Sequence, residues 1–346
     1  MRIGQAKELA RRWVHDEATG EPGFCGAFYH GSTNWHADET ELPATSDFDV
    51  MVVHADPDPP AKPGKFLYRG LLLEVSCLAF EQLRSPDAIL GNDQLAGSFR
   101  HPGIILDPTG RLTEVGAFVS ATYAKRPWVH RRCENARDNV LKHARTLRQS
   151  TPFHDQVTSW LFATGVLTHV LLVAGLENPT VRKRYVAARD LLTNGGRRDC
   201  YDPLLELLGC ARMSPKRVEH HLTALAAAFD DAKAVITTPF FFASDISDAA
   251  RPIALDGSRE LIDRGLHREA VFWLVATYGR CQKVLFHDAP PDLRDRHDPG
   301  FRHLLADLGI TSFADLRRRT SLVERFLPRV WEVAGEIMAA NPEIEE

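Results

Sequence analysis

The sequence predicts an α+β protein in which an N-terminal α/β domain with a mixed sheet precedes a larger, all-helical domain. Apolar, β-branched runs typical of strands, such as residues 48–53, mark the first third of the chain, and strands are hard to find beyond it. From about Glu114 onward the apolar residues recur with the 3.6-residue period of helices. A length of 346 residues with 44% hydrophobic and 25% charged residues suits a globular protein of two domains. We expect these domains to span residues 1–115 and 116–346.

The N-terminal part begins with an amphipathic helix within residues 1–18, because its apolar side chains share one side. Residues 24–54 read as a strand, a Gly-Ser turn, a polar insertion and a second strand. A proline-rich connector over 54–65 leads to an apolar segment, 66–80, which Gly70 interrupts and which we expect to form a hairpin or bent strand. A short strand over 104–106 closes this part.

The C-terminal part is predicted to be helical over residues 131–149, 153–176, 180–192, 203–208, 215–236, 259–285, 301–308 and 321–340. Residues 160–176 form the longest apolar stretch, but it is short for a bilayer span and contains His169. We therefore predict a buried core helix there and no membrane partner. We also place the aromatic residues 240–242 and Trp273 in the core.

Bulk charge and cysteine spacing narrow the classes of function. A formal net charge of −4 and a pI near 6.4 argue against a protein that binds long nucleic acid through its phosphates. The six cysteines contain no C-x-x-C pair, and no secretion signal is recognisable, so we expect reduced thiols and a cytoplasmic location. The histidines at 154, 220 and 221 lack partners at ligand spacing, which argues against a zinc site.

Three acidic residues carry the clearest chemical signal. Asp47 and Asp49 lie at the start of a predicted strand, where alternate residues point to one face, so both carboxylates share a face. Glu74 lies within a second apolar strand, where a carboxylate is costly to bury unless a cation pairs with it. The alternative partner for Glu74 is Arg69, in a buried ion pair. Carboxylate oxygens are the ligands that Mg²⁺ prefers, so we predict a magnesium site at Asp47, Asp49 and Glu74.

Small residues precede the two aspartates. Gly31 allows a tight backbone, and Ser32 offers a hydroxyl that can approach a triphosphate. Ser46, directly before Asp47, either hydrogen-bonds a nucleotide or caps the strand. Asp107, in contrast, stands in an Asp-Pro-Thr-Gly sequence that predicts a turn.

The pattern of Gly31-Ser32, Asp47-Phe48-Asp49 and a later Glu74 resembles the nucleotidyltransferase superfamily that includes DNA polymerase beta. It looks most like the branch that modifies small molecules, the aminoglycoside and lincosamide nucleotidyltransferases. The motifs cover roughly residues 24–110. Beyond that range the resemblance lies in the domain order and the helical content.

The resemblance implies a Mg²⁺-dependent enzyme that moves a nucleoside monophosphate, expected to be AMP from ATP, to a hydroxyl of a small molecule such as an aminoglycoside-like antibiotic. It implies that Ser32 and adjoining amides hold the β- and γ-phosphates, and that Lys183 of the helical domain contacts phosphate, although a solvated basic turn explains Lys183 equally well. Glu74 is either a third metal ligand or the general base. Pyrophosphate is the leaving group.

Two departures from the family pattern limit the resemblance. The gap of residues 33–46 is longer than usual, and His30 precedes Gly31 where a hydrophobic residue or tyrosine is commoner; we expect His30 to pack. Two alternative functions stay open: nucleotidyl transfer to a protein or RNA, and a non-catalytic nucleotide-binding regulator of the same fold. The acceptor, the base preference and the oligomeric state do not follow from the sequence.

Overall fold

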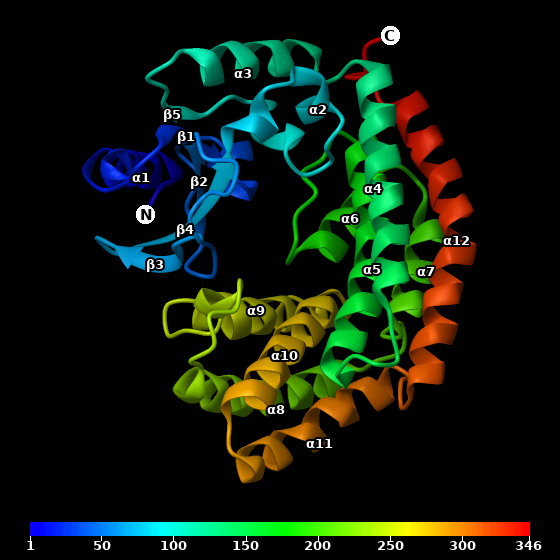
Figure 1. Ribbon diagram of the computed structural model, residues 1–346. Coiled ribbons are helices and arrows are strands. Elements are labelled where there is room, and N and C mark those ends of the chain that lie inside the picture. The colour runs from blue at the N-terminus through cyan, green and yellow to red at the C-terminus, as the bar shows by residue number, and fades with distance from the viewer. The chain divides into compact units, whose positions relative to one another are not determined.

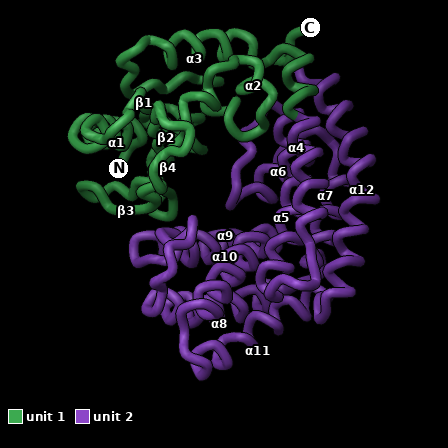
Figure 2. Tube along the Cα trace, in the orientation of Figure 1, with its two compact units in different colours: residues 1–132, 342–346 green, residues 133–341 purple.

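The computed structural model describes residues 1–346, and it confirms the α+β class: an N-terminal mixed sheet is followed by a mostly helical region (Figure 1). The chain divides into two compact units (Figure 2). Unit 1 contains residues 1–132 and 342–346, and unit 2 contains residues 133–341. The division falls within a helix, α4 (Arg126–Thr146), whereas the boundary predicted at 115/116 lies within α3 (Arg111–Thr122).

Unit 1 is built on a five-stranded sheet with the order β3-β4-β2-β1-β5. Its strands are β1 (Phe24–His30), β2 (Phe48–His54), β3 (Gly64–Tyr68), β4 (Leu71–Ala79) and β5 (Ile104–Leu106). Strands β2 and β4 run parallel, and the other neighbouring pairs are antiparallel. The two strands that carry the acidic residues are thus adjacent at the centre of the sheet.

Helical layers cover both faces of this sheet. Helix α1 (Ile3–Asp16) packs its apolar side, including Ala6, Ala10 and Trp13, against even-numbered residues of β2 such as Val50 (Figure 1). The opposite face buries Met51 and Val53 beneath short helices and α3. Those short helices are η3 (Phe80–Leu83), α2 (Pro86–Leu90) and η4 (Ala96–Phe99). Since Asp49 has the parity of Met51, its side chain belongs to this second face.

The hairpin predicted around Gly70 is confirmed. Arg69 and Gly70 connect β3 to β4, with φ angles of 50° and 84°. Two successive residues with positive φ are the signature of a tight hairpin turn whose twist matches that of the strands. This turn fixes the pairing of β3 with β4, and therefore which side chains of the two strands lie side by side.

Unit 2 is mostly helical and contains no strand of the sheet, as predicted. After α4 its helices are α5 (Phe153–Ala174), α6 (Arg184–Asn194), α7 (Arg198–Leu208), α8 (Pro215–Val235), the 3-10 helix η5 (Ala243–Asp245), the π-helix η6 (Pro252–Asp256), α9 (Gly257–Asp263), α10 (His267–Asp288), α11 (Pro291–Asp307) and α12 (Phe313–Ala340). The helix predicted over 259–285 is divided at Gly265, which takes φ 75°. Helix α11 begins ten residues before its predicted start at 301, with Pro291 in its first turn.

The apolar helix α5 lies in the core of unit 2. By length and composition it could cross a membrane, but 83% of its most apolar window is buried inside the protein. The prediction of a buried core helix is therefore confirmed.

One core prediction is wrong. Phe242 is buried, but Phe241 is 77% exposed. The rings of Phe240 and Phe242 stack on each other with centroids 5.1 Å apart, and the exposed ring of Phe241 packs edge-on against Phe242, with centroids 5.2 Å apart. Three consecutive residues of a non-helical segment cannot all reach the same core.

Candidate active site

Strand pairing places four polar side chains in one row across the second face of the sheet. Lys65 of β3 is paired with Glu74 of β4, Glu74 with Asp49 of β2, and Asp49 with His30 of β1. Residues that are directly opposite on neighbouring strands point to the same face. The row therefore follows from register alone, before any side-chain rotamer is considered.

Asp47, one residue before β2, joins this row. Ligand oxygens of Asp47, Asp49 and Glu74 all lie within 4.8 Å of one another. All three side chains are partly exposed, so a small solute can reach them. Three carboxylates at this separation suit a hard divalent cation such as Mg²⁺, which binds through one or two carboxylates and keeps other positions for water or phosphate oxygens.

Two lysines already pair with the acidic residues. The Nζ of Lys65 lies 3.1 Å from Oδ2 of Asp47 and also forms an ion pair with Glu74. The Nζ of Lys62 lies 3.2 Å from Oε1 of Glu74. The suggested pairing of Glu74 with Arg69 is wrong, because Arg69 belongs to the hairpin turn and its guanidinium lies over the ring of Tyr68.

Burial and charge act differently on the three carboxyl groups. Burial, together with the nearby Asp47 and Glu74, raises the pKa of Asp49 well above 3.8. Burial raises the pKa of Asp47 as well, against the opposing effect of Lys65. For Glu74, burial also favours the neutral form, but the ammonium groups of Lys65 and Lys62 together lower the pKa to about 2. Asp49 is thus the carboxylate with the greatest need of a further cation.

Gly31 is necessary because of its contact with Asp49. It has φ 71°, and a Cβ at this position would lie 1.9 Å from Oδ2 of Asp49. Only glycine adopts this backbone conformation freely and leaves room for the carboxylate. The glycine of the Gly-Ser pair therefore allows the backbone to pass directly beside the acidic cluster.

The other residues that the sequence singled out lie at different places in the fold. Ser32 is exposed and begins the 3-10 helix η2 (Ser32–Trp35). Ser46 is half-buried beside Asp47, and its backbone N–H donates to the carbonyl of Pro43 at 3.0 Å. Lys183 belongs to unit 2 and directly precedes α6, where burial lowers the pKa of its ammonium group. Asp107 is a turn residue, as predicted, and accepts a hydrogen bond from the N–H of Thr113 at 2.8 Å.

The insertion of residues 33–46 is anchored at both of its sides. Asn34 is buried and donates to the carbonyls of Ser98 and His101, at 3.2 and 3.1 Å. Further along, the carbonyl of Thr40 accepts from the N–H of Ile3 at 2.9 Å, and Asp38 pairs with Lys7 at 2.6 Å. The insertion thus connects η4 with the start of α1.

Sequence reasoning missed the partners of the acidic residues. Lys62, Lys65 and the contact between Nδ1 of His30 and Oγ of Ser98, at 2.5 Å, were not predicted. His30 was expected to pack; burial lowers its pKa, and Ser98 holds its ring. The hairpin predicted around Gly70 was the nearest signal: Lys65 lies four residues before Arg69 and Glu74 four residues after Gly70, so the two are opposite once the turn is known to consist of Arg69 and Gly70.

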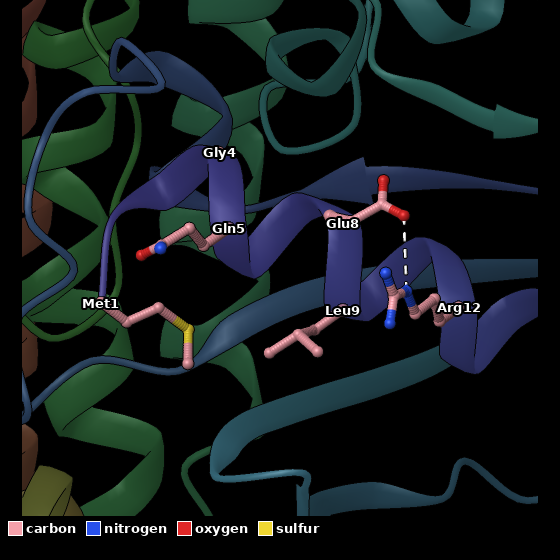
Figure 3. A pocket seen from close by; sticks show the side chains of 6 residues that line it. All are labelled: Met1, Gly4, Gln5, Glu8, Leu9 and Arg12. Carbon is pink, nitrogen blue, oxygen red and sulfur yellow. Dashed lines mark hydrogen bonds and ion pairs between the residues drawn. The ribbon is translucent and has the colours of Figure 1, made fainter.

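A surface hollow lies elsewhere in unit 1. It has a volume of about 520 Å³ and follows the outer side of α1, where Glu8 and Arg12 form an ion pair (Figure 3). None of the acidic cluster lines it. The chemistry of the cluster, rather than the size of a cavity, identifies the candidate site.

No family model matches the chain, and no curated protein matches its sequence.

Proposed function

We propose that this protein is a nucleotidyltransferase that moves a nucleoside monophosphate from an NTP to a hydroxyl group of a small molecule. The observation that carries the proposal is the convergence of Asp47, Asp49 and Glu74, whose ligand oxygens lie within 4.8 Å of one another. They lie beside Gly31, where any side chain would collide with Asp49. We take ATP as the nucleotide, an aminoglycoside-like compound as the acceptor class and the cytoplasm as the location, which are the expectations of the sequence.

The donor set fits a divalent cation. Asp47 and Asp49 would hold Mg²⁺, because burial and neighbouring carboxylates raise their pKa values against the opposing effect of the lysines, and a bound cation favours the charged carboxylates. When bound, the ion supplies charge neutralisation for the triphosphate and for the pentacoordinate phosphorus. Gly31 lets the backbone approach the phosphates closely, and the exposed Ser32 offers a hydroxyl beside them.

The chemical step is an in-line displacement. The acceptor oxygen forms a bond to the α-phosphorus, the bond to the bridging oxygen breaks, and pyrophosphate leaves. The acceptor hydroxyl gives up its proton to solvent water in this step. Glu74 is a poor proton acceptor, since two lysines lower its pKa to about 2, so we assign it to holding Lys62 and Lys65 rather than to the role of general base.

The test is a transfer assay with the whole chain. The purified protein is incubated with each labelled NTP, Mg²⁺ and a pooled acceptor library, and masses increased by a nucleoside monophosphate are sought. Asp47→Ala and Asp49→Ala should abolish both the mass addition and pyrophosphate release. Glu81→Gln is the matched control, because Glu81 is an exposed carboxylate of unit 1 that pairs only with Arg84.

Three outcomes would reject or narrow the proposal. Pyrophosphate release that persists in both aspartate variants would reject it. Binding of Mg·ATP without turnover across the library would favour a non-catalytic regulator. Transfer that requires added tRNA or protein would replace the small-molecule acceptor. The phosphate contact expected of Lys183 stays a prediction, which Lys183→Ala tests in the same assay.

A further inference from the structure

Lys65 is the cation that the acidic cluster already contains. Its side chain is only 8% exposed, and its Nζ lies 3.1 Å from Asp47 while it also pairs with Glu74. We propose that Lys65 is a built-in counter-ion that makes capture of a divalent cation by the cluster depend on the phosphates of the nucleotide. This inference rests on the proposed function, because it names the second ligand of that same site.

Through its contact with Asp47, the ammonium group of Lys65 competes with a metal ion for the same carboxylate. A cation held by Asp47 must approach the carboxylate to which the ammonium group of Lys65 is paired, and like charges at such a separation repel strongly in a partly buried site. Neither lysine forms an ion pair with Asp49, so this carboxylate attracts the cation without offering a full site. The cluster alone should therefore bind Mg²⁺ weakly.

A triphosphate changes this balance. Its anionic oxygens accept charge-assisted hydrogen bonds from an ammonium group, which has three donors. Lys65 can exchange Asp47 for a phosphate oxygen while Glu74 keeps hold of it, because Glu74 is its partner on the adjacent strand. Asp47 is then available to the metal. Nucleotide and metal should consequently strengthen each other's binding, as thermodynamic linkage requires.

Lys62 provides the matched comparison. It carries the same charge and also pairs with Glu74, at 3.2 Å, but it makes no contact with Asp47, and its side chain is 29% exposed. Removal of Lys62 changes the charge of the site by the same amount as removal of Lys65. Only the loss of Lys65 frees Asp47.

The experiment measures binding by calorimetry, without turnover. Mg²⁺ alone is titrated into wild type, Lys65→Gln and Lys62→Gln, and α,β-methylene-ATP is then titrated with Mg²⁺ and with EDTA. We expect Lys65→Gln to bind Mg²⁺ alone about tenfold more tightly than wild type and to lose about tenfold of the metal–nucleotide coupling. Lys62→Gln should change the coupling less than threefold. Binding of Mg²⁺ to the free analogue cancels in the ratio of wild type to variant.

The outcomes separate the two proposals. Strong coupling in wild type that Lys65→Gln retains would overturn the role of Lys65 and leave the proposed function intact. Equal effects of Lys62→Gln and Lys65→Gln would overturn it too, since net charge alone would then explain the result. If wild type binds no nucleotide, the proposed function fails and this inference falls with it. If Lys65→Gln does not fold, the charge-balanced variant Lys65→Gln/Glu74→Gln replaces it, with the same expected loss of coupling.

Discussion

Gly31, directly after β1, and Gly70, in the turn between β3 and β4, differ in their surroundings. Both have positive φ, 71° and 84°, which disfavours any residue with a Cβ. A Cβ on Gly31 would collide with the carboxylate of Asp49, whereas a Cβ on Gly70 would meet nothing within 4 Å. The two glycines therefore differ in whether a side chain at their position would displace a residue of the candidate site.

We expect Gly70→Ala to lower the free energy of unfolding by about 1 kcal/mol, the conformational cost alone, and to keep transfer activity. Gly31→Ala should cost more and lose at least 100-fold in transfer, because a 1 Å displacement at a reacting centre has about this effect. Urea unfolding and the transfer assay measure the two quantities. Equal activity in both variants would contradict the role given to Gly31.

The raised pKa of Asp49 predicts that this residue lowers the stability of the metal-free protein while it serves function. Its pKa in the folded, metal-free protein is well above its ordinary value of 3.8, so the folded state binds a proton there more tightly than the unfolded state. Stability from this group is fully present below pH 3.8 and is lost as the pH rises through the higher folded-state pKa. At neutral pH the carboxylate therefore destabilises the metal-free fold.

Asp49→Asn should accordingly raise the melting temperature at pH 7 without metal, and it should abolish transfer. The gain should shrink in Mg²⁺ plus ATP, since wild type is then stabilised by its ligands. Thermal melts of both proteins from pH 4 to 8, with EDTA and with Mg·ATP, give the comparison. A variant that is less stable than wild type under EDTA would show that Asp49 is not strained by its neighbours.

The acidic residues could be predicted from the sequence, but their partners could not. Alternation along one strand is enough to place Asp47 and Asp49 on one face, and it needs no knowledge of the neighbouring strands. The position of Lys65 beside Glu74 depends on the register of β3 with β4, which the turn at Arg69-Gly70 sets. A slip of one residue would have sent Lys65 to the opposite face.

At the scale of whole elements, strands were easier to locate than the ends of helices. The apolar runs of β2 and β4 contrast sharply with their flanks, and β5 ends at a turn with a clear sequence signal. Helix α11 begins with a polar stretch that has little apolar periodicity, and Pro299 lies inside it, so its first ten residues were missed. Any prediction from local sequence disfavours a helix that contains proline, because proline lacks the backbone N–H and its ring clashes with the preceding turn.

Two helical glycines of unit 2 test how tightly its elements pack. A Cβ on Gly165 of α5 would lie 2.3 Å from a ring carbon of Phe272 in α10, while a Cβ on Gly335 of α12 would meet nothing within 4 Å. Gly335→Ala should raise the free energy of unfolding by about 0.5–1 kcal/mol. Gly165→Ala should lower it by about 1–3 kcal/mol through overpacking. Urea unfolding measures both free energies. A higher free energy of unfolding in both variants would show that α5 and α10 can move apart to accommodate the added methyl group.

At the scale of the whole molecule, unit 1 is assembled from two distant parts of the chain. Residues 342–346 return to it after all of unit 2. The carbonyl of Glu345 accepts from the N–H of Arg126 at 2.7 Å, its N–H donates to the carbonyl of Ala124 at 3.0 Å, and Ile344 is buried. These contacts provide an acceptor for the start of α4, whose first N–H groups have none within the helix.

Deletion of residues 342–346 should therefore lower the free energy of unfolding by roughly 2–4 kcal/mol, from the loss of one buried isoleucine and two backbone hydrogen bonds. Hydrogen exchange should rise at the amides of residues 124–129. The control is Glu346→Gln, which removes only an exposed ion pair with Arg126 and should change stability little. Unchanged exchange after the deletion would show that α4 begins stably without the tail.

This return of the chain also orders events during synthesis. The strands of the sheet and the three acidic residues lie between residues 24 and 106, which leave the ribosome early. The segment that completes unit 1, residues 342–346, emerges only after residues 133–341. Unit 1 therefore lacks its C-terminal segment while the larger unit 2 is synthesised. We therefore expect the nascent chain to expose the start of α4 to chaperones and proteases for most of translation, until its last contact is made.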